Sequence, residues 1–149
     1  MLILMSNIQN QNTKVSEELG FEVRVDAPYD ETIDAVTEAL EAEGFGVLTR
    51  IDVDRAFRDE IGTHFRPYTI LGACNPQLAR IALTIAPEVG LMLPCNVTIE
   101  ADIDGSVIRI ANPTIFMQTK KLWFDEELRS ATYEATTRLM RVAETLRIH

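Results

Sequence analysis

Hydrophobic and polar residues follow two different periods along this chain, and the period changes several times. Between residues 21 and 26, apolar residues alternate with charged ones, which is the period expected for a strand with one buried face. From Tyr29 to Leu40, apolar residues recur every three or four positions opposite an acidic face, and Gly44 then supplies a stop signal. This segment predicts a strand followed by an amphipathic helix.

The same two periods divide the remainder of the chain. Asp52 can cap a short helix that ends at Gly62, and the pair Asn75-Pro76 is typical of a helix start. Pro87 ends that second helix, and Asp104-Gly105 is typical of a tight hairpin turn. The predicted elements are strands at 45–52, 66–73, 95–102 and 107–111 and helices at 53–61, 76–86 and 125–147.

These elements predict an α+β protein with a mainly antiparallel sheet of about five strands. The hairpin forces at least one antiparallel pair, and the last helix carries one apolar seam from Leu128 to Leu146 that should cover the sheet. We expect helices on one face. The length of 149 residues suits a single domain, which we place at 20–149, after a flexible leader at 1–19 whose polar segment shows no periodicity.

The charge of the chain limits its partners. Three lysines and eleven arginines face 23 acidic residues, for a net charge of -9. Because phosphate binding needs clustered basic residues, we expect no nucleic acid partner. We find no apolar run long enough to span a membrane and no basic signal region, so a cytoplasmic location without membrane contact is expected. The acidity suits a salt-adapted, halophilic cytoplasm or an ordinary acidic protein equally well.

Three segments carry a resemblance to a known family: GFGVLTRIDV (Gly44 to Val53), FRPYTILGACNP (Phe65 to Pro76) and GLMLPCNV (Gly90 to Val97). With them, residues 21–113 resemble the family called domain of unknown function 302, and the last helix does so less specifically. The resemblance implies a curved antiparallel sheet similar to the TATA-binding-protein class, and a homodimer. It implies no reaction, and likeness to a DNA-binding fold is not evidence of DNA binding.

One position departs from the family pattern. The family usually ends its last strand with an Asp-Pro pair, whereas this chain has Asn112-Pro113, so no role of that carboxylate carries over.

The two cysteines are the best chemical lead, and each precedes an asparagine, in Cys74-Asn75 and Cys95-Asn96. Cys74 ends a predicted strand beside a helix N-terminus, which would lower the pKa of its thiol. If the two strands run antiparallel, as the resemblance implies, both thiols lie at one end of the sheet. We therefore expect reduced, neighbouring cysteines, with Cys74 the more reactive, in a site for a small molecule, a thiol reactant or a soft metal.

The other candidate residues extend this hypothesis. Asn75 and Asn96 could orient a small polar ligand, and Tyr68 and Arg66 flank the cysteine strand and could line a pocket. Copper(I) held by both cysteines is the weak metal candidate. A closed zinc site is not predicted, because no CxxC is present and only His64 lies near a motif. The sequence names no cofactor.

The alternative is a non-catalytic dimeric module in which the cysteines are core residues. Cys95 shares a strand face with Val97, and capping alone explains Asn75. Trp123 and Phe124 would then anchor the last helix or contact the second subunit. Within the hypothesis of a cysteine site, binding is favoured over catalysis, because neither cysteine motif contains a general base.

Overall fold

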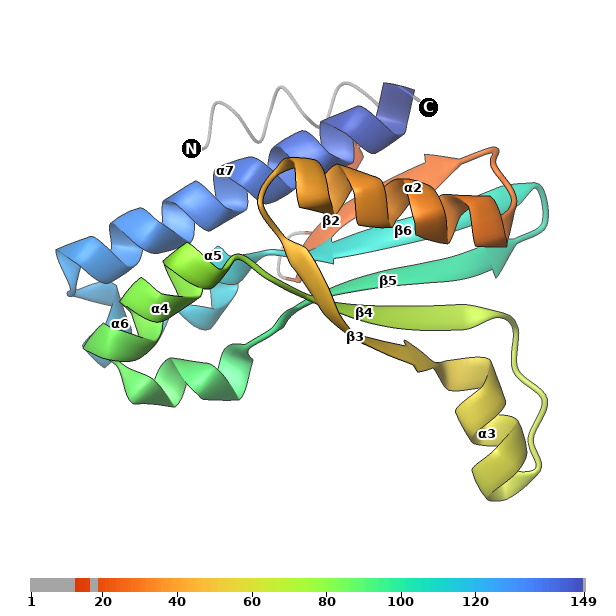
Figure 1. Ribbon diagram of the computed structural model, residues 1–149, viewed down its shortest axis with the longest axis horizontal. Coiled ribbons are helices and arrows are strands. Elements are labelled where there is room, and N and C mark those ends of the chain that lie inside the picture. Colours follow the sequence, from red (N-terminus) through yellow and green to blue (C-terminus); the bar gives the residue numbers. More distant parts are fainter. Residues whose placement is uncertain (1–12, 17–18, 149) are drawn as a thin grey trace.

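A twisted antiparallel sheet organises the computed structural model, which describes residues 13–16 and 19–148 (Figure 1). Within these residues six strands lie in the order β1-β2-β6-β5-β4-β3, and every neighbouring pair is antiparallel. The predicted α+β class and antiparallel sheet are confirmed. The strands are β1 (Thr13–Ser16), β2 (Gly20–Val25), β3 (Gly46–Asp52), β4 (Tyr68–Cys74), β5 (Cys95–Asp102) and β6 (Gly105–Ala111).

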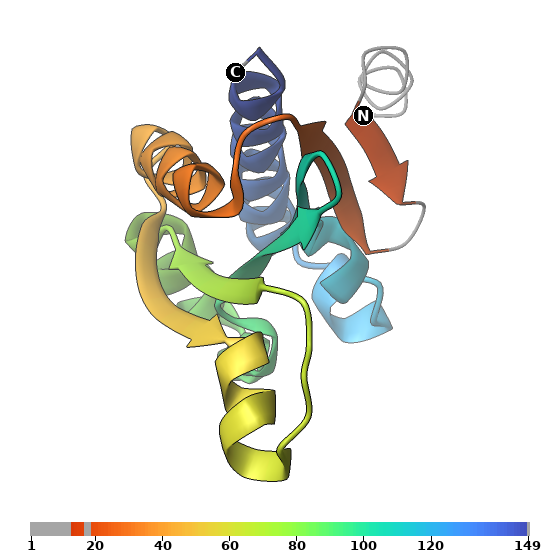
Figure 2. The same cartoon turned by 90° about the vertical axis from the view of Figure 1, so that its right-hand side faces the viewer.

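Two long helices cover one face of this sheet. They are α2 (Tyr29–Ala42) and α7 (Glu126–Ile148). Turning the molecule shows α3 (Val53–Ile61) projecting away from this body at the end of β3 (Figure 2). The short helices gather at the other end of the sheet, beneath the first turns of α7, and are α4 (Pro76–Ile85), η1 (Pro87–Met92), α5 (Pro113–Phe116) and α6 (Lys120–Trp123).

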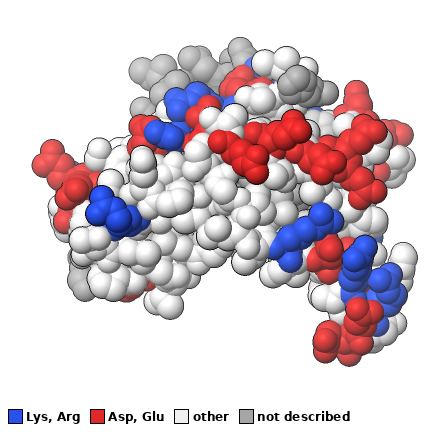
Figure 3. Space-filling model, in the orientation of Figure 1, with Lys and Arg blue, Asp and Glu red and all other residues white. Residues whose placement is uncertain are grey.

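The hydrophobic period of α2 explains how this helix packs. Ile33, Val36 and Leu40 are buried against the sheet, whereas the acidic residues of the opposite face lie in solvent. A band of carboxylates is accordingly visible over α2 in the space-filling view (Figure 3). The helix ends where Gly44 adopts a left-handed φ of 83°, a conformation that glycine takes without steric cost.

Two hydrophobic clusters make up the interior. The main cluster joins the sheet to α2 and α7 and includes Phe21, Leu40, Leu71, Ile99, Ile108 and Leu139. The satellite cluster joins η1 to α5, α6 and the start of α7, and consists of Ala86, Val89, Met117, Leu122 and Leu128. The main and satellite clusters therefore meet at one end of the sheet, where β4 ends and β5 begins.

Of the two helix starts for which a cap was predicted, α4 has the predicted capping hydrogen bond and α3 does not. The Leu78 amide donates to Asn75 Oδ1 at 3.1 Å, and Pro76 occupies the first turn of α4. Asp52 precedes α3 as predicted but makes no capping hydrogen bond. Its carboxylate accepts instead from Thr69 Oγ1 at 3.0 Å and from Arg50 Nε at 3.0 Å, so this side chain ties strand β3 to β4.

The expected leader needs a correction. Residues 13–16, which we expected to be flexible, form β1 and pair with β2. Residues 1–12 and 17–18 of the leader lie outside the described residues. Among the helices that the structure describes, none is both long enough and apolar enough to cross a membrane.

Candidate functional site

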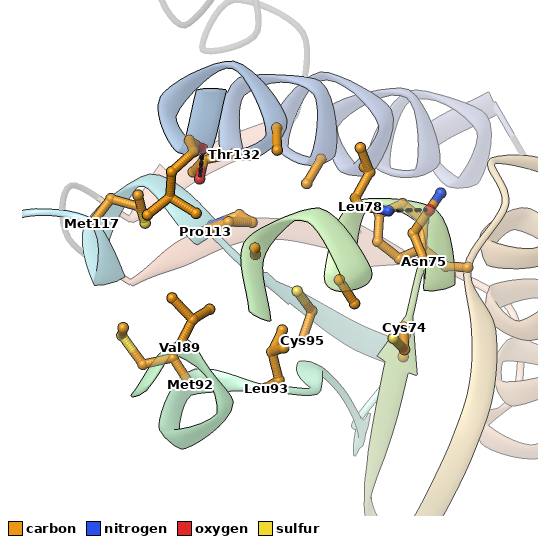
Figure 4. Close-up of a pocket in the computed structure, with 17 residues that line it drawn as sticks. Cys74, Asn75, Leu78, Val89, Met92, Leu93, Cys95, Pro113, Met117 and Thr132 are labelled. Carbon is orange, nitrogen blue, oxygen red and sulfur yellow. Dashed lines mark hydrogen bonds between the residues drawn. The ribbon is translucent and has the colours of Figure 1, made fainter. Parts of the chain in front are cut away.

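A partly enclosed cavity of about 70 Å³ lies between the end of the sheet and the short helices (Figure 4). Its walls come from β4, α4, η1, the start of β5, α5 and the first half of α7, together with Phe45, which directly precedes β3. The chain turns sharply here because β4 ends at Cys74 and α4 begins at Pro76. The cavity therefore occupies the seam between the main and satellite clusters, where the two hydrophobic regions meet without filling the space.

Both cysteines line this cavity, but not as the pair that we expected. Cys95 lies opposite Ala73 in the β4–β5 ladder, and Cys74 is the next residue, whose side chain has the opposite strand parity. The two thiols are free and do not lie close together, although both are at the same end of the sheet. The prediction of neighbouring thiols was wrong because strand parity separates them.

The thiols also differ from the expected reactive pair in their electrostatics. Burial raises the pKa of Cys74, and burial together with the charge of Cys74 raises the pKa of Cys95 to about 11. The expected depression of the Cys74 pKa by the helix N-terminus is therefore not found. The Leu78 amide at this helix N-terminus already donates to the side chain of Asn75, and the walls around the thiol are apolar.

Thiol labelling tests this electrostatic description. In Cys95→Ala and Cys74→Ala, each remaining thiol should react more slowly at pH 7 than free cysteine, whose pKa is about 8.5. The rate should rise about tenfold per pH unit, because only the thiolate attacks, and for Cys95 the rise should continue above the pKa of free cysteine, because burial still acts on this thiol after the charge of Cys74 is removed. A Cys74 that reacts at pH 7 faster than free cysteine would restore the active-thiol hypothesis.

Each polar side chain of the cavity wall already makes a hydrogen bond to the protein backbone. Thr132 Oγ1 donates to the carbonyl of Leu128 at 2.8 Å, and Asn75 Oδ1 is used in the α4 cap. The other lining side chains that carry a heteroatom carry sulfur, and they are Cys74, Cys95, Met92 and Met117. Sulfur is polarisable and makes dispersion contacts rather than strong hydrogen bonds. The wall therefore suits an apolar ligand.

The structure separates the other sequence candidates from this cavity. Asn96 is exposed on β5 and does not contribute to the walls. Tyr68 begins β4, at the strand end opposite Cys74. Arg66 Nε donates to Glu100 Oε2 at 2.6 Å, and its guanidinium lies 4.4 Å from the centre of the Phe65 ring. Of the six candidates, Cys74, Asn75 and Cys95 line the cavity, whereas Asn96, Tyr68 and Arg66 do not.

Sequence reasoning missed the part of the wall that lies far away along the chain. These residues are Val89 of η1, Met117 directly after α5, and Leu128 and Ala131 of α7. Of these residues only Leu128 was a predicted core position, on the apolar seam of the last helix, and only the tertiary fold shows that a space remains between the four side chains. Trp123 and Phe124 do not line the cavity and have exposed fractions of 41% and 76%.

The cavity shows no metal chemistry in the part of the chain that is described. No group of three or more histidine, cysteine, aspartate or glutamate residues lies close enough together there to hold a metal ion. The weak copper candidate, Cys74 with Cys95, fails because the two sulfurs are not close.

Comparisons with known proteins agree with the resemblance noted from the sequence. A solved structure, the crystal structure of uncharacterized conserved protein DUF302 from Bacillus stearothermophilus, is similar with a TM-score of 0.73 and 30% sequence identity. The match covers 83% of this chain and 94% of that chain. A search of curated proteins found no match. The family model described as Domain of unknown function DUF302 matches residues 21–146, and the chain therefore belongs to the DUF302 family.

Proposed function

We propose that the protein binds a small apolar molecule in the cavity between β4, α4, η1 and α7. The observation that carries this proposal is an apolar, partly enclosed space whose polar side chains are already hydrogen-bonded to the protein. Apolar pockets with a defined shape are the usual sites of small-molecule binding. The volume of about 70 Å³ is roughly half that of the ~150 Å³ apolar cavity known to take up benzene.

This volume and wall chemistry restrict the ligand. A short alkyl chain, or the alkyl end of a longer molecule whose polar part stays in solvent, fits the space and its apolar lining. The sulfur atoms of Cys74, Cys95, Met92 and Met117 would contact such a group through dispersion. A charged ligand would lose its hydration without gaining a partner, so it is disfavoured.

Binding is favoured over catalysis by the groups that are missing from the described walls. The residues lining the cavity include no histidine and no carboxylate, and both thiols have raised pKa values. A nucleophile of this kind would need a nearby base.

The cytoplasmic location and the salt-adapted character that the sequence led us to expect remain predictions.

A methyl NMR titration with xenon and with n-pentane tests the proposal. The methyl groups of Leu78, Val89 and Leu128 should shift in a saturable way, because all three side chains line the cavity. In Ala131→Leu the new side chain should occupy the space from α7 and weaken binding by at least about tenfold. Ala42→Leu, an exposed position at the end of α2, is the matched control and should bind as the wild type does.

The proposal fails if the wild-type methyl shifts do not saturate. It also fails if a folded Ala131→Leu protein binds xenon as tightly as the Ala42→Leu control does.

A further inference from the structure

The strand β3 forms an open edge of the sheet in the part of the chain that the structure describes. It pairs with β4 on one side and stands last in the strand order. Its seven residues, GVLTRID, contain neither lysine nor proline, the residues that commonly protect edge strands from pairing. Leu48 and Ile51 have exposed fractions of 67% and 51%. A free edge with large apolar side chains is suited to pairing with another strand.

The helix that follows extends this exposed region. α3 projects from the body of the molecule, and none of its residues is buried (Figure 2). Phe57 and Ile61 belong to one apolar stripe of α3 and have exposed fractions of 37% and 68%. We call Leu48, Ile51, Phe57 and Ile61 together the edge surface. It is a run of exposed large apolar side chains on two consecutive elements, as expected of a contact region.

The charge around the edge surface points to the partner. Residues 46–66 contain four arginines and four carboxylates, so the whole net charge of -9 is carried by the rest of the chain. The space-filling view shows this contrast, with carboxylates massed over α2 and mixed charge at β3 and α3 (Figure 3). A second acidic copy is repelled by the α2 side but meets no net charge here. A basic partner would instead be drawn to α2.

The order of charges along β3 supports a symmetric contact. Arg50 and Asp52 flank Ile51, and in one chain Arg50 Nε lies 3.0 Å from Asp52 Oδ1. If two β3 strands run antiparallel about an axis at Ile51, each Arg50 stands opposite Asp52 of the other copy. Residues 50–52 pair about this axis, because Thr49 would already lie opposite Val53, the first residue of α3, and the bulge between Val47 and Thr49 lies outside the paired residues.

We propose that two copies of this chain associate through the edge surface, with their β3 strands paired antiparallel about a two-fold axis at Ile51. The two sheets then form one continuous sheet, and each α3 begins at the residue that follows the pairing strand. The family resemblance implies a homodimer but no surface. The surface is assigned here by the open edge, the exposed apolar residues and the local charge balance.

Light scattering after size exclusion, over a wide concentration range, tests the assignment. The wild type should give the dimer mass, and Ile51→Arg should raise the dimer dissociation constant by at least about tenfold, because it places two like charges at the axis. Ile103→Arg is the matched control. Ile103 has an exposed fraction of 95% in the β5–β6 turn, and this variant should dimerise as the wild type does.

A crosslink provides a second, independent measurement. Under mild oxidation Ile51→Cys should form a disulfide-linked dimer, since the two residues meet at the axis, whereas Ile103→Cys should not. A wild type that stays at the monomer mass up to about 1 mM would overturn the proposal. So would a dimer that tolerates Ile51→Arg as well as it tolerates Ile103→Arg.

Discussion

Replacement of Phe45 by alanine should lower the free energy of unfolding by about 3 to 5 kcal/mol and should enlarge the cavity. Phe45 has an exposed fraction of 1%, belongs to the main cluster and also lines the cavity. This side chain therefore belongs both to the cavity wall and to the main cluster. Removing the ring costs the transfer free energy of the buried carbons and leaves a space that the rigid sheet cannot fill.

Urea denaturation with and without benzene measures both consequences. Without ligand, Phe45→Ala should unfold at a lower urea concentration than the wild type. Saturating benzene should return part of the lost stability, because a ligand that binds only the folded state stabilises it. Phe65→Ala is the control, since Phe65 is only partly buried and lies outside the cavity. Equal benzene stabilisation of both variants would contradict the assigned position of the cavity.

Loss of the Glu100 charge should have the second largest effect. Glu100 lies on the face of the sheet away from α2 and α7, with an exposed fraction of 7%, and both Arg66 and Arg109 donate to its carboxylate. Burial alone would raise the pKa of Glu100, but the hydrogen bonds from Arg109 and Arg66 hold it below its ordinary value of 4.5. Glu100→Gln should therefore cost about 1 to 3 kcal/mol near neutral pH.

The pH dependence gives this prediction a sign. A carboxyl whose pKa is lower in the folded state stabilises the fold above its unfolded pKa, and this contribution is lost as the pH falls through the folded pKa. The stability difference between wild type and Glu100→Gln should thus be complete above about pH 5 and should shrink in acid. Glu38→Gln, on the exposed face of α2, is the control and should change stability little. A difference that does not vary with pH would show that the charge of Glu100 is not responsible.

Much of the fold follows from local patterns that can be read before any tertiary contact is known. The alternation in β2 and β5, the turn at Asp104-Gly105 and the apolar seam of α7 each predicted an element that the structure contains. Such patterns arise because one face of a strand or helix is buried and the other is exposed. They could not predict η1, because its six residues, PEVGLM, have no hydrophobic period to read.

The candidate site was only partly accessible to the same reasoning. Asn75 could be placed correctly, because an N-cap followed by proline is a local signal. The pKa of Cys74 could not be predicted from the sequence. The helix N-terminus predicts a lower pKa, whereas burial by side chains from distant elements raises it. The cavity itself is a space between η1, α5 and α7 that no side chain fills, and no local sequence pattern indicates such a space.

The separation of the interior into a main and a satellite cluster has an evolutionary consequence. Substitutions in Val89, Met117 or Leu128 change the cavity from the satellite side, where no strand of the sheet is involved. The pairing that holds β2, β6, β5 and β4 together depends on residues of the main cluster. Evolution can therefore reshape the cavity by varying a few positions of the satellite cluster while the sheet remains under unchanged selection for folding.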